Sequence, residues 1–476
     1  MNRKKGIAIH WFRRDLRLTD NPALAEACSY EWVVPIFIWD PNSSWERALG
    51  RASAWWLNQS LHALSAQLQQ SDRQLIIAVG NPVDILGDMV RASKAEAVFW
   101  NRLYEPKTLR YDASLRNRLS RQVKHVGIFD SYLLVEPDQA LKKDGTPYRV
   151  YTAFYNTIRK IIKTHSLCPK AILPPLPPGN YPSAPVDTLN LVPLKSWTEG
   201  LAALWYPGEE HAQRVLKDFV QNHSAHYKIQ RDLPYEEGTS RLSPFLHFGE
   251  ISVASIFHRV ASLQGAQKSP FLKELIWREF SHHLLVHFPN MEVEPLNKSF
   301  EQFPWQQNES LFKAWTQGRT GYPIVDAGMR QLWKTGWMHN RVRMIVASFL
   351  VKDLLIPWQR GADWFWDTLV DANLANNTQN WQWVAGCGAD AAPYFRIFNP
   401  ILQGEKFDPE GLYVKTWCPE LSKLPKKWVH KPWAVPEIKL PEFGILLGKT
   451  YPFPIVDHVR ARLRALLAYD RIRKKI

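Results

Sequence analysis

Four side chains with complementary chemistry stand close together in the segment ELIWREFS. Positions i, i+3, i+4 and i+7 hold Glu274, Trp277, Arg278 and Ser281. A helix places these four on one face. Facing a solvent-filled cavity, the indole can stack on a flat base and the carboxylate can accept its hydrogen bonds. A core tryptophan with Glu274 and Arg278 paired at its edge explains the segment equally well, so both interpretations stay open.

A second segment, GWMHNRVRMIVASFLVKDLL, combines polar and soft apolar side chains at helical spacing. One face of the helix expected over residues 336–355 carries Asn340, Arg343, Met344 and Ala347. An amide, a cation and a polarizable thioether suit the wall of a pocket for a planar ligand. A partly solvated helix with an apolar back is the alternative.

Two further segments are rich in small and turn-forming residues. The stretch DANLANNTQNWQWVAGCGADAAPYFRIFNP has Asn377 four residues before Trp381, and its glycines and alanines allow a ligand to approach the backbone closely. EEGTSRLSPFLHFGE offers hydroxyl groups and Arg241 at an expected helix start, which suits an anion or a phosphate. An irregular loop and simple helix capping are the respective structural alternatives.

The elements that must position these side chains differ between the two parts of the chain. Short apolar runs, most of them separated by helical segments, occur at 7–12, 33–39, 74–80, 97–101 and 126–129. Strands that alternate with helices predict a doubly wound parallel α/β sheet. The dinucleotide fingerprint G-x-G-x-x-G is missing after the first strand, so a dinucleotide is expected to bind elsewhere.

The second part of the chain is expected to be all-α. Prolines crowd the stretch from about Leu167 to Val186, where they forbid a continuous helix or a central strand. Helical periodicity then continues almost to the end, with a long helix expected over 271–288. We therefore predict an α/β domain over 1–135, a Pro-rich linker over 136–200 and a helical domain over 201–476.

The composition favours a nucleic-acid partner and gives no sign of a metal site. Sixty Lys and Arg against 45 Asp and Glu give a net charge of +15, which attracts polyanions or only makes a basic surface. Four scattered cysteines suggest reduced thiols, with neither a disulfide framework nor zinc. The short apolar run near the start is no export signal. With no stretch of about 20 apolar residues, we expect a cytoplasmic protein that does not enter membranes.

Five motifs in the same order make the sequence resemble the photolyase/cryptochrome family over nearly its whole length. They are WFRRDLRLTDNPAL, GTSRLSPFLHFGEIS, ELIWREF, TGYPIVDAGMRQLWKTGWMHNRVRM and NWQWVAGCGADAAPYFRIFNP. The resemblance implies an α/β antenna domain and a helical domain that binds FAD. It also implies light-driven repair of cyclobutane pyrimidine dimers in DNA by a chain that acts as a monomer, without an obligate protein partner.

The resemblance also implies roles for individual residues. The residues that match the FAD-binding set are Tyr227, Thr239, Ser240, Arg241, Leu242, Ser243, Arg343, Asp371, Ala372, Asn373 and Asn377. The DNA-facing and lesion-facing set is matched by Arg231, Glu274, Trp277, Arg278, Asn340, Arg341, Met344, Trp383 and Gln403. An electron relay from the surface to photoexcited flavin is matched by Trp305, Trp358 and Trp381. Most relatives have an aspartate where this chain has Asn373.

Three questions follow from the resemblance. The segment 101–112 matches neither the folate-binding nor the deazaflavin-binding pattern of the family's antenna domains. As the antenna chromophore, a folate, 5,10-methenyltetrahydrofolate, is favoured over 8-hydroxy-5-deazaflavin. A cryptochrome-type photoreceptor without repair is the main alternative function, and the chain end soon after the last helical segment favours repair. A colourless helical DNA-binding protein is a third candidate function.

The expected lesion is the cyclobutane dimer. A (6-4) product requires a proton donor, and His339 is turned about 100° from Asn340 on the helix.

Overall fold

The computed structural model describes residues 3–162, 167–192, 195–263, 269–391 and 396–473. Its backbone divides into two compact units. Unit 1 comprises residues 1–224 and 240–289, and unit 2 comprises residues 225–239 and 290–476. Among the described residues, no helix is long and apolar enough to cross a membrane.

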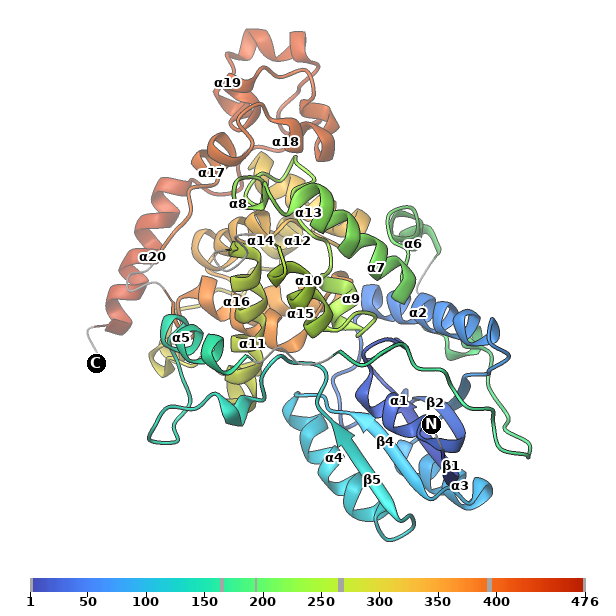
Figure 1. Ribbon diagram of the computed structural model, residues 1–476. Helices are drawn as coiled ribbons and strands as arrows, with labels where there is room; N and C mark the ends of the chain where they lie inside the picture. Colours follow the sequence, from blue (N-terminus) through green and yellow to red (C-terminus); the bar gives the residue numbers. More distant parts are fainter. Residues whose placement is uncertain (1–2, 163–166, 193–194, 264–268, 392–395, 474–476) are drawn as a thin grey trace. The chain divides into compact units, whose positions relative to one another are not determined.

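Unit 1 contains a five-stranded parallel sheet (Figure 1). Its strands are β1 (Lys4–Phe12), β2 (Tyr30–Trp39), β3 (Ile76–Val79), β4 (Ala97–Asn101) and β5 (His125–Phe129), in the order β3-β2-β1-β4-β5. The predicted strands and the doubly wound α/β fold are confirmed. All strand pairs are parallel, as expected for strands joined by helical crossovers.

Helices cover both faces of this sheet. On one face, α3 (Pro82–Ser93) and α4 (Pro106–Leu119) pack through Leu86 and Leu115 against a core that includes Ile9. On the other face, α1 (Pro22–Ala27) packs through Ala27 against Ala8. Because both faces are buried, the strands are apolar on both sides and lack a polar–apolar alternation.

The remaining helices of unit 1 include the segment with Glu274 and Trp277. They are α2 (Arg51–Gln69), α5 (Tyr151–Ile161), α6 (Lys195–Ala202), α7 (Glu209–Asp218), α9 (Ser243–His247), α10 (Val253–Ala261) and α11 (Pro270–His287). The long helix expected over 271–288 is therefore confirmed as α11. Between residues 167 and 185 the backbone forms neither helix nor strand, because prolines supply no backbone donor. Helix α5 lies in the segment that we expected to act as a linker.

The described part of unit 2 is helical. Its α-helices are α8 (Tyr227–Gln230), α12 (Glu309–Thr316), α13 (Pro323–Thr335), α14 (Asn340–Ser348), α15 (Trp358–Thr368), α16 (Leu374–Ala385), α17 (Pro400–Phe407), α18 (Leu412–Trp417), α19 (Lys426–Val429) and α20 (His458–Arg473). The helix expected over 336–355 begins later, because Gly336 ends α13 at φ 66° and the His339 side chain caps α14. A π-turn over Phe349–Asp353 continues α14.

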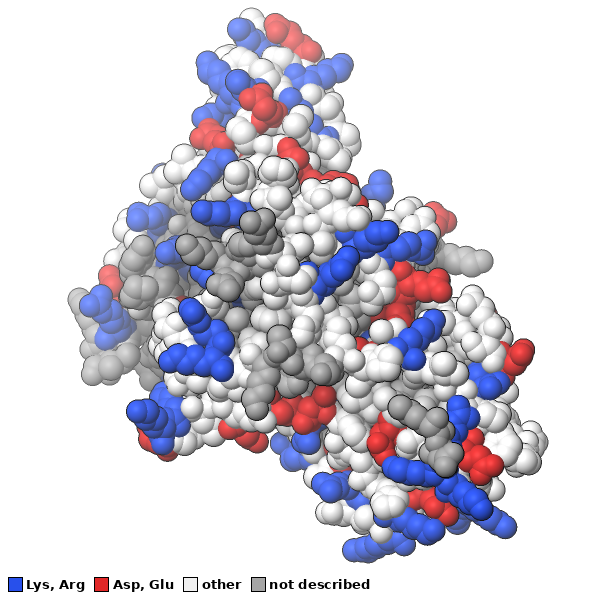
Figure 2. Space-filling model, viewed as in Figure 1, with Lys and Arg blue, Asp and Glu red and all other residues white. Residues whose placement is uncertain are grey.

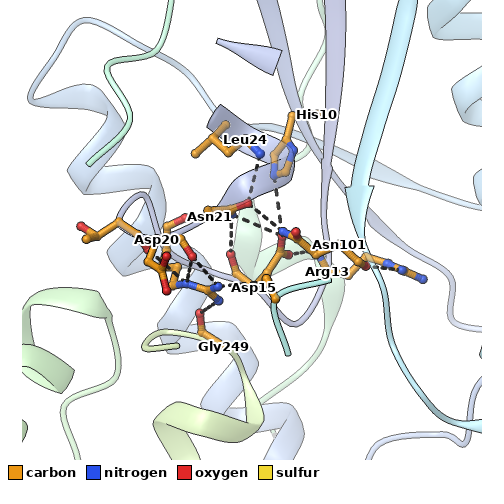
Figure 3. A network of polar contacts seen from close by, with 11 residues as sticks. His10, Arg13, Asp15, Asp20, Asn21, Leu24, Asn101 and Gly249 are labelled. Carbon is orange, nitrogen blue, oxygen red and sulfur yellow. Dashed lines mark hydrogen bonds and ion pairs between the residues drawn. The ribbon is translucent and has the colours of Figure 1, made fainter. Parts of the chain in front are cut away.

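A buried polar network explains much of the motif WFRRDLRLTDN after β1 (Figure 3). Arg13 donates two hydrogen bonds of 2.9 Å to Asp112 and one to the carbonyl of Asn101. The Asn101 amide donates to Asp15 and Asn21. These groups lie near the carboxyl ends of β1 and β4, where the strand order reverses and doubly wound sheets commonly bind ligands. In this chain, the motif's own side chains link the ends of the two strands.

Replacing Asp112 by asparagine is expected to lower the free energy of unfolding by about 3–5 kcal/mol, because it leaves the Arg13 guanidinium buried without its countercharge. Denaturant titration followed by circular dichroism measures the change. Asp88→Asn is the matched control: Asp88 pairs with Arg91 on the surface, where both side chains are more than 60% exposed, so a loss of about 1 kcal/mol or less is expected. Equal losses in the two variants would contradict this account of the network.

Candidate functional site

The aromatic side chain of the ELIWREFS segment lies in a cluster of rings in unit 1. Trp277 is half-buried on α11, and its indole stacks on Tyr151 with ring centroids 3.6 Å apart and planes 6° apart. Phe280 meets the same indole edge-on, at 5.7 Å and 72°. Glu274, one turn earlier on α11, is also half-buried. The carboxylate and the indole therefore share a partly exposed face, as predicted.

Arg278 belongs to the interior of unit 1 instead. Only 8% of the residue is exposed, its Nη1 donates to the Tyr132 carbonyl at 2.9 Å, and its guanidinium lies over the Tyr132 ring. One residue of helix turns a side chain by about 100°, which takes Arg278 away from Trp277 toward the Glu279 carboxylate. The placement of Arg278 among the DNA-facing residues is thus corrected.

The segment GTSRLSPF turns sharply before α9. Arg241 has a left-handed backbone, with φ 50°, and Leu242 is buried. The Ser240 hydroxyl accepts a hydrogen bond from the Leu242 amide at 3.4 Å, and Ser243 begins α9. Hydroxyl and amide groups are thus gathered at the expected helix start. The capping alternative remains open for Ser240.

The family resemblance also implies that Arg343 and Asp371 pair beside the flavin ring, and unit 2 brings these two residues together. Arg343 on α14 lies 2.8 Å from Asp371, whose side chain is almost fully buried. The Arg343 Nε also donates to the Met338 carbonyl at 2.7 Å. Two fixed partners hold the guanidinium in one orientation. The predicted ion pair is therefore present.

Asn373 and Asn377 are placed by the start of α16. Asn373 is the N-cap of this helix, and its Oδ1 accepts from the Asn376 amide at 3.0 Å. An aspartate oxygen makes the same cap, so asparagine at 373 removes a charge without disturbing the helix start. Asn377 donates from Nδ2 to the Ala362 carbonyl on α15 at 2.9 Å. Ala372, which precedes the cap, is buried.

The expected DNA-facing residues of α14 form a partly exposed row. Asn340 is exposed, Arg341 pairs with Asp232 at 2.7 Å, and Met344 is half-buried. His339 is 1% exposed, and burial lowers its pKa to about 4. Its Nδ1 accepts from the Arg341 amide. The prediction that this histidine packs away from the Asn340 face is confirmed.

The other predicted residues of unit 2 lie on α8, α16 and α17 and in the segment that follows α8. Tyr227 is buried on α8, with the Arg231 guanidinium 5.9 Å from its ring centroid. Thr239, Trp383 and Gln403 are half-buried. Thr239 follows Gly238, where an added Cβ would lie 2.3 Å from Gln230, so only glycine fits. Residues 392–395 of the last motif lie outside the described residues.

The comparisons with known proteins cover the whole chain. A family model described as DNA photolyase matches residues 8–178, and one described as the FAD binding domain of DNA photolyase matches residues 271–471. The deoxyribodipyrimidine photo-lyase of Agrobacterium fabrum is 47% identical over 100% of both chains. The chain belongs to the photolyase/cryptochrome family. Cryptochrome-1 of Arabidopsis thaliana is 40% identical, over 97% of this chain and 70% of the relative.

Solved structures of photolyases agree with this assignment. A bacterial class III photolyase from Agrobacterium tumefaciens has a TM-score of 0.94 at 46% identity, covering 99% of this chain and 98% of its own. An archaeal photolyase from Sulfolobus tokodaii, solved with two FAD molecules, has a TM-score of 0.82 at 31% identity and covers 98% and 100%. The α/β domain and the helical domain are therefore those of the photolyase fold.

The three tryptophans that match the family's electron relay lie on neighbouring elements of unit 2. Trp381 and Trp358 are each 2% exposed, and Trp305 is half-buried. A Cβ at Gly361 would lie 2.1 Å from the Trp381 ring, so this ring rests directly on α15. Trp358 is three residues before Gly361 on the same helix face. The Gln306 amide donates to the Leu355 carbonyl at 2.8 Å, which brings the backbone beside Trp305 close to the start of α15.

Sequence reasoning missed a buried lysine in the π-turn after α14. Lys352 is 3% exposed, its ammonium donates to the Arg396 carbonyl, and burial lowers its pKa to about 7 despite the neighbouring Asp353. The apolar run MIVASFLV before it gave no reason to expect a charge inside. Among the described residues, no group of three metal-ligating side chains is present.

Lys352 makes stability depend on pH in a predictable direction. The unfolded chain keeps the lysine proton up to the ordinary pKa of 10.5, whereas the folded chain releases it above about 7. The unfolded state then binds more protons, so the free energy of unfolding rises with pH, by about 2 kcal/mol from pH 7 to 9. Lys352→Met should lack this rise. Urea titrations of both proteins at several pH values measure the difference, and parallel pH profiles would contradict it.

Proposed function

We propose that this chain repairs cyclobutane pyrimidine dimers in UV-damaged DNA, using blue light and reduced FAD. The observation that carries the proposal is the 47% identity to a deoxyribodipyrimidine photo-lyase over the full length of both chains. Cryptochromes of the plants Arabidopsis thaliana and Sinapis alba are 38–40% identical, over 70–96% of their own length. Glu274, Trp277 and Trp383, which match the family's lesion-facing positions, are all present. These observations favour repair over signalling without repair.

FAD is proposed to bind through the residues that match the family's flavin-binding set. These are Tyr227, Thr239, Ser240, Arg241, Leu242, Ser243, Arg343, Asp371, Ala372, Asn373 and Asn377. The donors and acceptors fit a flavin, because hydroxyls and Arg241 suit its phosphates while Arg343, Asp371 and Asn377 complement the ring's polar edge. Bound FAD supplies the light-driven electron that opens the dimer. The protein binds, orients and shields the reacting groups.

The lesion is proposed to be bound with its bases flipped out of the DNA double helix. A damaged base pair costs less to flip than an intact one, and Trp277 and Trp383 offer flat surfaces for the splayed bases. Glu274 accepts hydrogen bonds from a thymine edge. Arg231, Asn340, Arg341, Met344 and Gln403 complete the DNA-facing set.

The chemistry near Asn340 favours cyclobutane dimers over (6-4) products. A (6-4) product needs a transferred proton as well as an electron, a task suited to a histidine that titrates near neutral pH. His339 does not meet this need, because it is buried and burial lowers its pKa to about 4. Met344 carries no transferable proton and suits a dimer that requires only an electron.

The proposed electron relay can be tested at its outermost tryptophan. Trp305→Phe is expected to slow the light-driven reduction of oxidised FAD, because phenylalanine is harder to oxidise than tryptophan. Repair by enzyme reduced beforehand in the dark should remain near that of the unchanged chain. Transient absorption measures the first rate and a repair assay measures the second. Equal photoreduction with and without the substitution would show that electrons enter by another route.

The surface charge and the antenna chromophore add two smaller proposals. Lys and Arg side chains occupy many parts of the face in Figure 2, in keeping with a net charge of +15 and a DNA partner. A second chromophore, 5,10-methenyltetrahydrofolate ahead of 8-hydroxy-5-deazaflavin, is proposed as an antenna. Mass spectrometry of extracted chromophores tests its identity. We further propose a monomer that acts in the cytoplasm.

The function is tested by a repair assay with the full chain. The protein is purified, reduced, and mixed with a duplex that carries one thymine dimer, either in the dark or under blue light. Restored thymines are expected only in the illuminated sample. Bound FAD without any light-dependent repair would instead support a cryptochrome-type photoreceptor, and a protein without flavin would overturn both.

A further inference from the structure

We infer that Tyr151 is a positioning residue that holds the Trp277 indole from one side, so that the opposite side is left to receive a base of the lesion. The inference rests on the proposed function, since it concerns how Trp277 binds the dimer. Tyr151 lies on α5, outside the motifs that suggested the site. The contacts that support this role all lie within unit 1.

Tyr151 contacts α11 through both its aromatic ring and its hydroxyl group. Its ring lies flat against the Trp277 indole, at 3.6 Å and 6°. Its hydroxyl donates to the carbonyl of Lys273 at 2.7 Å, one turn before Trp277. Burial, together with the nearby Tyr155 and Glu274, raises the pKa of Tyr151. The hydroxyl therefore keeps its proton and continues to donate this hydrogen bond.

A third ring limits the remaining freedom of the pair. Phe280, one turn after Trp277 on α11, meets the indole at 72° and the Tyr151 ring at 67°. Edge-to-face and stacked contacts both stabilise aromatic pairs beyond the area they bury. With one face against Tyr151 and Phe280 at its edge, the indole is held in a single orientation.

Helix α5 is itself anchored firmly enough to act as a support. Phe154 and Ile158 are 1% and 0% exposed, and Phe154 contacts Phe280 and His283 of α11, with ring centroids 5.1 Å and 5.0 Å apart. The Tyr148 amide donates to His283 at 3.1 Å just before the helix begins. Movement of Tyr151 away from Trp277 would have to disturb this buried packing.

This arrangement limits Trp277 to one stacking partner from DNA. An indole has two faces, and Tyr151 covers one of them. The other face is oriented before DNA arrives, so binding a flipped base does not have to restrict the indole further. The expected consequence is a preference for the dimer-containing duplex that depends on the flat ring at position 151 and on Trp277 together.

The test compares the affinity of the full chain for a duplex with one thymine dimer and for the same undamaged duplex. Tyr151→Ala should weaken binding of the dimer duplex about fivefold, the order expected for losing an aromatic pair. Binding of the undamaged duplex should change by less than about twofold. Tyr151→Phe keeps the flat ring and should bind like the unchanged chain. Tyr206→Ala, at an exposed tyrosine elsewhere in unit 1, is the matched control and should leave the preference intact.

Coupling to Trp277 separates positioning from a general loss of structure. In a chain that already carries Trp277→Ala, Tyr151→Ala should cause no further loss of dimer binding. Additive losses, or an unchanged preference in Tyr151→Ala, would overturn the inference. Should the alanine variant not fold, Tyr151→Leu retains apolar volume without a flat face and must lose the preference. An unchanged chain that does not favour the dimer duplex would overturn the proposed function itself.

Discussion

Replacing Asp371 by alanine is expected to release FAD from the purified protein. The carboxylate is almost fully buried and lies 2.8 Å from Arg343, so its removal leaves a guanidinium beside the proposed flavin site without its countercharge. Breaking a buried pair in this way costs about 3–5 kcal/mol, and if this free energy is lost from FAD binding the affinity falls by about a hundredfold to several thousandfold. Absorbance at the flavin bands, divided by the protein concentration, measures the retained cofactor.

The matched control for this prediction is Glu420→Ala. Glu420 pairs with Arg330 at 2.7 Å, also in unit 2, with both side chains about one quarter exposed. Its loss can lower stability but should not change the flavin content. If Asp371→Ala retains as much FAD as Glu420→Ala, the Arg343–Asp371 pair does not hold the flavin.

A second large effect is expected from Trp383→Ala. Trp383 is half-buried on α16, and stacking of one base on an aromatic side chain contributes about 1–3 kcal/mol. Its loss should weaken binding of the dimer-containing duplex about tenfold to a hundredfold, with little effect on the flavin spectrum. Fluorescence anisotropy with a labelled duplex measures the affinity.

Trp333→Ala serves as the control for that substitution. Trp333 is 40% exposed and stacks on Trp364 at 5.8 Å, but it matches no family position in the DNA-facing set. Its loss removes a comparable ring without touching the proposed site. Equal losses of affinity in the two variants would mean that Trp383 contributes no specific contact with the lesion.

The sheet could be predicted from sequence because its strands are short apolar runs separated by helices. Both ends of every strand lie within three residues of their predicted positions, and the largest differences are the starts of β1 and β2, which come three residues earlier, at Lys4 and Tyr30. The start of α14 was harder to predict from the sequence. A positive φ at Gly336 and a histidine cap at His339 interrupt an apolar pattern that continues on both sides.

The candidate site was predictable in part, from the family resemblance for Arg343 and Asp371 and from helix geometry for His339. The pairing of Arg343 with Asp371 and the burial of His339 agree with the structure. Arg278 was misplaced because adjacent residues of one helix were assigned to the same face. Tyr151 was missed because α5 lies within the segment 136–200 that was expected to be a Pro-rich linker. The apolar spacing of Phe154 and Ile158 with it was the signal that could have revealed α5.

The most direct measurement presents the reduced full chain with two matched duplexes under blue light. One carries a cyclobutane thymine dimer and the other a (6-4) product at the same position, and chromatography quantifies the restored thymines. We expect light-dependent repair of the cyclobutane dimer and none of the (6-4) product, because His339 is buried and neutral. Efficient repair of the (6-4) product, or no repair of the dimer in light, would contradict this expectation.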